Sequence, residues 1–164
     1  MAKGRKRRKG ETFETEVRRR FGPLAEQFGL IEVPADNRFV GASEVDYSNG
    51  RLRYDWSCDG WEDYMFILVI LELDGFRHVV GLKELVAATR SAGDQPLLDN
   101  CRSWLVLQRA VESHTQWVER LHPRLTAPDA ADFVVAAGGS RRSLSDPGPG
   151  LDLDWFRKMP PADE

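Results

Sequence analysis

Cysteine and histidine are scarce in this sequence of 164 residues, which has two cysteines, Cys58 and Cys101, and three histidines. Two cysteines cannot form the disulfide framework of a small secreted domain, so we expect two reduced thiols. None of these side chains has a neighbour at the spacing of a zinc-ligand pair such as Cys-x2-Cys. The sequence therefore predicts no metal site and no cofactor, and the histidines are expected at the surface or at helix ends.

Long apolar runs are also lacking. The longest run, Met65 to Leu71, has seven residues, whereas a membrane-spanning helix needs about 20. The basic N-terminus is not followed by the apolar segment of a signal peptide. We therefore expect a cytoplasmic protein without a membrane segment. The fractions of hydrophobic residues, 41%, and charged residues, 30%, are ordinary for a soluble globular protein.

Familiar catalytic motifs are missing as well. The sequence has neither a phosphate-binding P-loop nor a Gly-x-Ser-x-Gly nucleophile elbow. Cys58 lies beside Asp55 and Asp59, whose charges raise a thiol pKa and disfavour the reactive thiolate. We expect a protein that is not an enzyme and has no catalytic residues. An enzyme would need a deep pocket lined by residues such as Asp55, Glu72 or His78.

Charge is distributed unevenly along the chain. Residues 1–20 contain nine Lys or Arg and three Glu, whereas residues 21–164 contain 14 basic and 23 acidic side chains. Residues 1–10 are expected to form a disordered basic arm, because like charges at this density repel one another and stay solvated. Such an arm binds nucleic acid by releasing counterions. The candidate polyanion-binding residues are Lys3, Arg5, Lys6, Arg7, Arg8 and Lys9. A solubilising terminus and a contact with the acidic body are the alternatives.

Residues 11–137 are expected to form a single α+β domain. Apolar residues recur at spacings of three and four over residues 11–29, which predicts a helix with a kink or a new start at Pro23. The same periodicity predicts helices over residues 82–90 and 97–121. Residues 130–137 fit either a short helix or an edge strand.

Strand-like segments lie between these helices. The predicted strands cover residues 30–33, 39–47, 51–57 and 64–73. Asn49-Gly50 is the signature of a type I′ hairpin, in which both residues have positive φ. Leu52, Tyr54 and Trp56 are expected on one face of their strand. The predicted fold class is α+β: an antiparallel β-meander of three to five strands, helices packed on one face, a disordered basic N-terminal arm and a flexible C-terminal tail.

The C-terminal region, residues 138–164, combines a linker with an aromatic and acidic tail. Glycine, serine and proline dominate residues 138–150, as in flexible linkers. Large apolar side chains then return, which a disordered tail has little reason to carry unless they dock. These candidate docking residues are Leu151, Leu153, Trp155 and Phe156. They dock either on the protein's own body or, as a short linear motif, on a partner.

One ten-residue run mixes acids with aromatics more densely than the rest of the chain. Aromatic residues are enriched at interface hot spots, and acids steer association with basic partners. The run therefore predicts a protein-binding surface, and the alternative is that its tryptophans belong to the core. The candidate binding residues are Asp55, Trp56, Asp59, Trp61, Glu62, Asp63 and Tyr64.

Three features carry a resemblance to a known group of proteins: the segment Phe21-Gly-Pro-Leu-Ala-Glu-Gln-Phe-Gly-Leu30, the Asn49-Gly50 hairpin and Leu82-Lys-Glu-Leu-Val86. In these features, residues 13–125 resemble small uncharacterised bacterial α+β proteins of the immunity-protein type, which neutralise toxins by binding. The resemblance implies a non-enzymatic protein-binding module of immunity or adaptor type, with a protein partner. A nucleic-acid- or ribosome-associated protein, using the basic arm, is the alternative.

Overall fold

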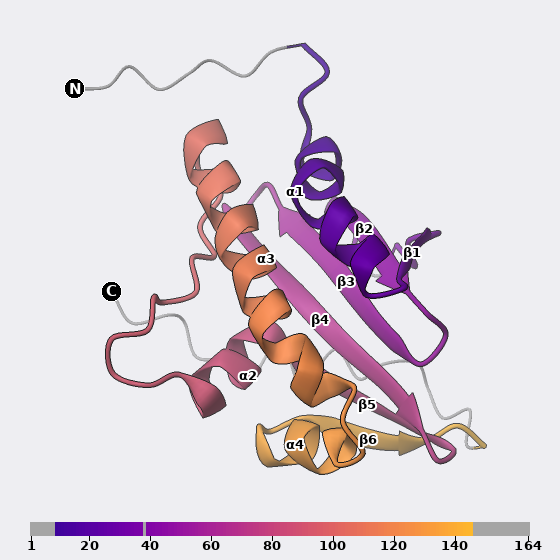
Figure 1. Ribbon diagram of the computed structural model, residues 1–164. Coiled ribbons are helices and arrows are strands. Elements are labelled where there is room, and N and C mark those ends of the chain that lie inside the picture. Colours follow the sequence, from indigo (N-terminus) through magenta and orange to yellow (C-terminus); the bar gives the residue numbers. More distant parts are fainter. Residues whose placement is uncertain (1–8, 38, 146–164) are drawn as a thin grey trace.

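The computed structural model describes residues 9–37 and 39–145. These residues form an α+β fold in which six antiparallel strands are joined in the order β1 to β6 (Figure 1). The strands are β1 (Ile31–Val33), β2 (Ser43–Ser48), β3 (Leu52–Asp59), β4 (Tyr64–Leu73), β5 (Phe76–Gly81) and β6 (Ser140–Ser143). The helices are α1 (Phe13–Gln27), α2 (Leu82–Thr89), α3 (Trp104–Leu125) and α4 (Ala130–Ala136). The α+β class is confirmed, but the prediction of three to five strands was too low.

Helix α1 begins at Phe13, within the predicted range of 11–29, and has a capping box at Thr12. The Thr12 hydroxyl accepts a hydrogen bond from the backbone N–H of Thr15, whose hydroxyl in turn accepts one from the N–H of Thr12. Glu14 and Glu16 occupy the first turn, where the helix dipole favours acids. The helix continues through Pro23 as one element, so no new helix begins there.

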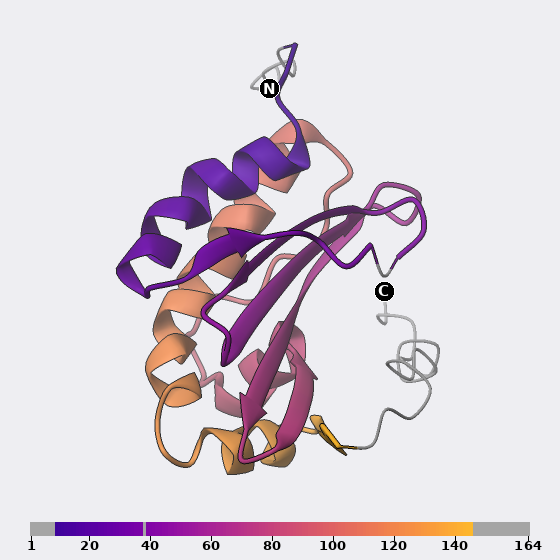
Figure 2. The same ribbon diagram turned by 90° about the vertical axis from the view of Figure 1, so that its right-hand side faces the viewer.

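Period-two alternation divides the β3 side chains between two faces of the sheet. Leu52, Tyr54 and Trp56 are all buried on one face, as predicted. Helices α1 and α3 lie together against this face, where Figure 2 shows them on one side of the sheet. Phe21 of α1 packs its ring 5.0 Å from the Trp56 ring and 5.1 Å from the Tyr47 ring, between centroids. The main core therefore lies between this face and the two longer helices.

The hairpin turn at Asn49-Gly50 differs from the prediction. In the β2–β3 turn only Gly50 has positive φ, so Asn49-Gly50 is not a type I′ turn. The side-chain oxygen of Asn49 instead accepts hydrogen bonds from the N–H groups of Arg51 and Leu52. Positive φ at both turn residues, which type I′ requires, occurs at Asp74-Gly75 between β4 and β5.

Helix α3 begins later than the predicted span of 97–121. Ser103 caps it by accepting a hydrogen bond from the N–H of Val106. Residues before the cap are irregular, and they lie along the start of β4, where the N–H of Met65 donates to the carbonyl of Asp99 at 2.8 Å. The helix continues through Pro123 to Leu125. No helix in the described ranges is long and apolar enough to span a membrane.

The last described elements, α4 and β6, decide one open prediction and correct another. Residues 130–136 form a helix, which decides between the two alternatives. Ser140–Ser143, which were assigned to the flexible linker, instead pair with β5. Gly139 makes the step from α4 to β6 possible, because a Cβ there would lie 2.6 Å from Val134 Cγ1 and 2.7 Å from the Val134 carbonyl oxygen.

We predict that Gly139→Ala destabilises the protein by about 1–3 kcal/mol, because the added methyl group overpacks the contact between α4 and β6. Urea denaturation followed by circular dichroism measures the change. Gly60→Ala is the matched control, since nothing lies within 4 Å of a Cβ at Gly60, and its effect should stay within about 0.5 kcal/mol. Equal stabilities of the two variants would contradict the close packing of β6 on α4.

Candidate functional site

The acidic and aromatic run that predicted a binding surface is divided by strand β3. Trp56 is 0% exposed and belongs to the core, so its assignment to the surface was wrong. Asp55, the preceding residue, points to the opposite face and is also buried. Only the part of the run in the β3–β4 turn and its two ends remains available to a partner.

Asp55 belongs to a charged network on the sheet face opposite α1 and α3. Asp46 and Asp55 are direct cross-strand partners. The Arg53 guanidinium donates hydrogen bonds to both carboxylates and lies 3.3 Å from the Asp36 carboxylate. Burial, with the Asp55 charge as a second cause, raises the pKa of Asp46 from 3.8 to about 6. Arg53 opposes this shift, so the network holds two acids together rather than offering them to a partner.

The β3–β4 turn presents a tryptophan. The Trp61 side chain is 90% exposed. Its backbone N–H donates to the Asp59 carboxylate at 2.8 Å, which fixes the start of the turn. The end of the turn is fixed by a second bond, from the N–H of Cys101 to the carbonyl of Asp63 at 2.8 Å. The exposed ring is therefore carried by a turn with defined anchors.

A loop distant in sequence lies beside Trp61. A Cβ at Gly41 would be only 3.6 Å from the indole nitrogen of Trp61, so the two residues are close neighbours. The adjacent residue, Val40, is fully exposed. Sequence reasoning missed Val40 because it was placed inside a predicted strand. We call these residues the sheet-end surface: Val40, Gly41, Asp59, Trp61, Glu62 and Asp63.

The charge of the sheet-end surface is predominantly acidic. Glu62 is exposed, and Asp59 and Asp63 are half-buried. The Arg102 guanidinium lies 3.7 Å from the Asp63 carboxylate, with both side chains substantially exposed. Such an exposed pair contributes little to stability. Tyr64, the last residue of the predicted run, is half-buried, with the Lys83 ammonium 5.9 Å from its ring centroid.

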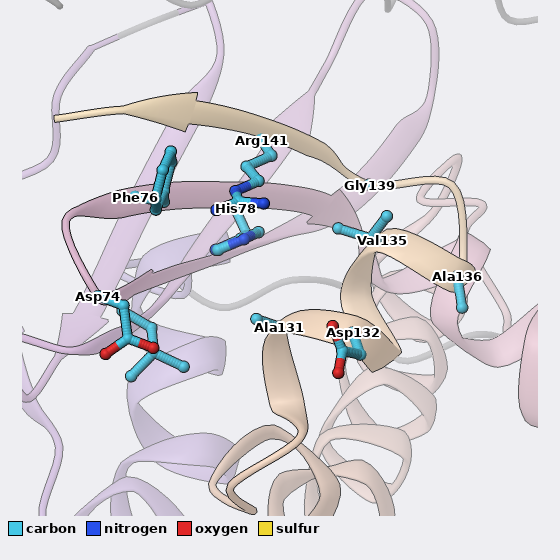
Figure 3. Close-up of a pocket in the computed structure, with 10 residues that line it drawn as sticks. Asp74, Phe76, His78, Ala131, Asp132, Val135, Ala136, Gly139 and Arg141 are labelled. Carbon is cyan, nitrogen blue, oxygen red and sulfur yellow. The ribbon is translucent and has the colours of Figure 1, made fainter.

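A pocket of about 480 Å³ opens between β5, β6 and α4, at the far edge of the sheet from β1. Figure 3 shows His78 projecting from β5 toward α4. His78 is 3% exposed, and its Nδ1 atom has no hydrogen-bond partner among the described residues. Arg141 also lines the pocket and lies 3.7 Å from the Phe76 ring centroid. The volume is sufficient for a small molecule.

Of the three residues suggested for an enzyme pocket, only His78 lines this one. Asp55 belongs to the network with Arg53, and Glu72 forms an ion pair with Arg77 on the opposite face of the sheet. The pocket therefore does not bring together the acids that the enzyme alternative required.

The other two histidines are buried, which contradicts a surface position, although His122 does lie at a helix end, in the last turn of α3. His114 Nδ1 lies 2.9 Å from the Ala110 carbonyl oxygen, and burial lowers its pKa to about 4, so its ring is neutral. His122 Nδ1 lies 2.9 Å from the hydroxyl of Tyr54, and its ring stacks on Phe28. Within the described part of the chain, no three His, Cys, Asp or Glu side chains gather as metal ligands do.

Two of the predicted functional segments lie mainly outside the described residues. This applies to the tail residues Leu151, Leu153, Trp155 and Phe156 and to the basic residues Lys3, Arg5, Lys6, Arg7 and Arg8. Lys9 is described and is exposed. Polyanion binding by the arm and docking of the tail both stay predictions.

Comparisons with protein-family models, curated proteins and solved structures find no match for this chain. The resemblance to immunity-type proteins therefore stays a prediction.

We predict that the stability of the protein falls as pH rises from about 4 to about 6 through the titration of Asp46. Folded Asp46 keeps its proton up to a pKa of about 6, whereas the unfolded group releases it near 3.8. The folded state therefore binds more protons in this window, and the contribution that is present at low pH is lost at higher pH. The Asp46→Asn variant lacks the titration. Its stability relative to the wild type should rise by about 2–3 kcal/mol from pH 4 to pH 7.

Urea unfolding across this pH range measures the effect, and Glu32→Gln is the control. The hydrogen bond from Arg18 lowers the pKa of Glu32, so the Glu32 contribution is lost as pH falls, which is the opposite direction. Parallel stability curves for the wild type and Asp46→Asn would show that folding does not raise the pKa of Asp46.

Proposed function

We propose that this protein is a non-enzymatic protein-binding module that docks a basic segment of a partner protein on the sheet-end surface. The observation that carries the proposal is the 90% exposure of Trp61 on a turn that is anchored at both ends. An exposed tryptophan is unfavourable in water. It is also the residue type most enriched among interface hot spots.

The shape of the sheet-end surface supports this proposal. Trp61 and Val40 are exposed apolar side chains from two separate loops, and Gly41, next to Val40, brings the second loop close to the indole ring. Two hydrogen bonds restrict the conformation of the turn before a partner arrives: the N–H of Trp61 donates to the Asp59 carboxylate, and the N–H of Cys101 donates to the Asp63 carbonyl. Preorganisation of this kind reduces the entropy lost on binding.

Charge favours a basic partner. Three carboxylates, Asp59, Glu62 and Asp63, surround the tryptophan, and one arginine, Arg102, offsets a single charge. Carboxylates at the rim of an interface accelerate association with a positively charged surface and impose salt dependence on it. Exposed apolar side chains with acidic neighbours fit a segment in which an apolar side chain is flanked by Lys or Arg. A toxin partner would make the protein immunity-type, and a regulatory partner would make it adaptor-type.

We predict that Trp61→Ala weakens binding to the native partner by at least about 30-fold, as truncation of a hot spot does. The partner is captured from cells of the source organism by affinity purification and mass spectrometry, and its affinity is then measured by calorimetry. Ile31→Ala is the matched control: Ile31 is 67% exposed, and β1 pairs with the part of β2 beside the Asn49-Gly50 turn, at the other end of the β2–β3 hairpin.

A second variant, Glu62→Gln, should slow association at low salt and have little effect at high salt. Circular dichroism confirms that each variant is folded. Unchanged affinity of the Trp61→Ala protein would overturn the assignment of the sheet-end surface, whatever partner is captured.

A further inference from the structure

Two thiols from distant parts of the chain meet beside the first half of β4. Cys58 lies near the end of β3, and Cys101 lies in the irregular segment between α2 and α3. Their Sγ atoms are 3.3 Å apart, although the residues are separated by 43 positions in the sequence. Both are free thiols, and both side chains are partly accessible. Sequence spacing gave no sign of this pairing.

The segments that carry the two thiols are fixed close together by backbone hydrogen bonds. The N–H of Cys101 donates to the carbonyl of Asp63, and the N–H of Met65 donates to the carbonyl of Asp99, each at 2.8 Å. Met65 is also the cross-strand partner of Cys58. The contact between the sulfur atoms therefore belongs to the sheet and does not arise from two mobile loops. A shift of little more than 1 Å between the sulfur atoms reaches disulfide bonding distance.

We propose that Cys58 and Cys101 are a redox modification site that closes to an intramolecular disulfide by exchange with a small disulfide such as glutathione disulfide. The thiolate of one cysteine attacks a sulfur of the small disulfide, and one glutathione thiolate leaves. The second cysteine, as a thiolate, attacks the mixed disulfide and releases the second glutathione. The protein loses two protons and two electrons, and one glutathione disulfide is reduced to two glutathione molecules.

The surroundings of Cys58 and Cys101 make thiol–disulfide exchange slow. Burial is the main cause that raises the pKa of both thiols. The hydrogen bond between them raises the pKa of Cys58 further and opposes the rise at Cys101, and nearby carboxylates raise the pKa of both. The carboxylates are Asp59 and Glu14 around Cys58, and Asp59, Asp63 and Asp99 around Cys101. Because exchange requires the thiolate, the raised pKa values slow the closure, and the disulfide forms only during prolonged exposure to the oxidant. The cysteine pair adjoins the sheet-end surface, because the N–H of Cys101 anchors the turn that carries Trp61 and because Asp59 and Asp63, which belong to that surface, also lie near the thiols. The exchange chemistry itself does not require the proposed docking of a partner.

The test exposes the full-length reduced protein to excess glutathione disulfide at mildly alkaline pH and follows intact mass. The expected product is a monomer that has lost two hydrogens, carries no glutathione and has no titratable thiol after denaturation. Peptide mapping should recover the segments containing Cys58 and Cys101 joined. The melting temperature should rise by roughly 5–10 °C, because the bond closes a long loop in the unfolded chain, and dithiothreitol should reverse the rise.

The single variants Cys58→Ser and Cys101→Ser are the controls. Each lacks the second thiol, so each should accumulate a stable mixed disulfide with glutathione where the wild type does not. A wild-type protein that retains stable glutathione adducts, forms disulfide-linked dimers or keeps both thiols free throughout the reaction would overturn the proposal. The wild-type measurement decides the matter even if a serine variant fails to fold.

Discussion

The packing of Phe21 against Trp56 is the interaction on which the other features of this protein depend. Both side chains are fully buried, and their contact holds α1 against β2 and β3. Strand geometry then fixes the rest of β3: because Trp56 points into the core, its neighbour Asp55 must point to the opposite face. Arg53 joins Asp55 and Asp46 there. The turn that follows β3 is directed away from the core and carries Trp61 into solvent.

This division explains why two neighbouring parts of one acidic, aromatic run have different physical roles. The buried carboxylates of Asp46 and Asp55 are opposite each other on the adjacent strands β2 and β3, and the Arg53 guanidinium donates hydrogen bonds to both. They therefore form a structural network and not a recognition surface. The buried network is sensitive to pH, because desolvation raises the pKa of Asp46. The carboxylates around Trp61 are more exposed, and a partner can therefore interact with them without first desolvating a buried charge.

Much of the central fold could be predicted from the sequence, because α1 has a capped amphipathic pattern and β2 to β4 have strong alternation or long apolar runs. β5 was missed because Arg77 and His78 interrupt its apolar character, and β6 because Ser140–Ser143 have no apolar residue. Both strands form because they pair with neighbouring strands: β5 pairs with β4, and β6 pairs with β5. The late start of α3 has a similar cause: Leu97, Leu98 and Cys101 extend the helical spacing, but backbone pairing with β4 keeps that segment irregular. The sheet-end surface was predicted only in part. The sequence indicated Trp61 and its acidic neighbours, but Val40 is distant in sequence and lies near them only because of the tertiary fold.

Trp56 and Trp61 lie on opposite sides of the boundary between core and solvent, and the fold of β3 and the sheet-end surface both depend on this difference. A soluble gadolinium chelate tests it directly, because it broadens the NMR signals of indole N–H groups that solvent can reach. Trp56→Phe and Trp61→Phe variants assign the two signals. The structure predicts that the Trp61 signal is lost at low chelate concentration while the Trp56 signal persists. Equal broadening of both signals would contradict the fold of β3 and the position of the sheet-end surface.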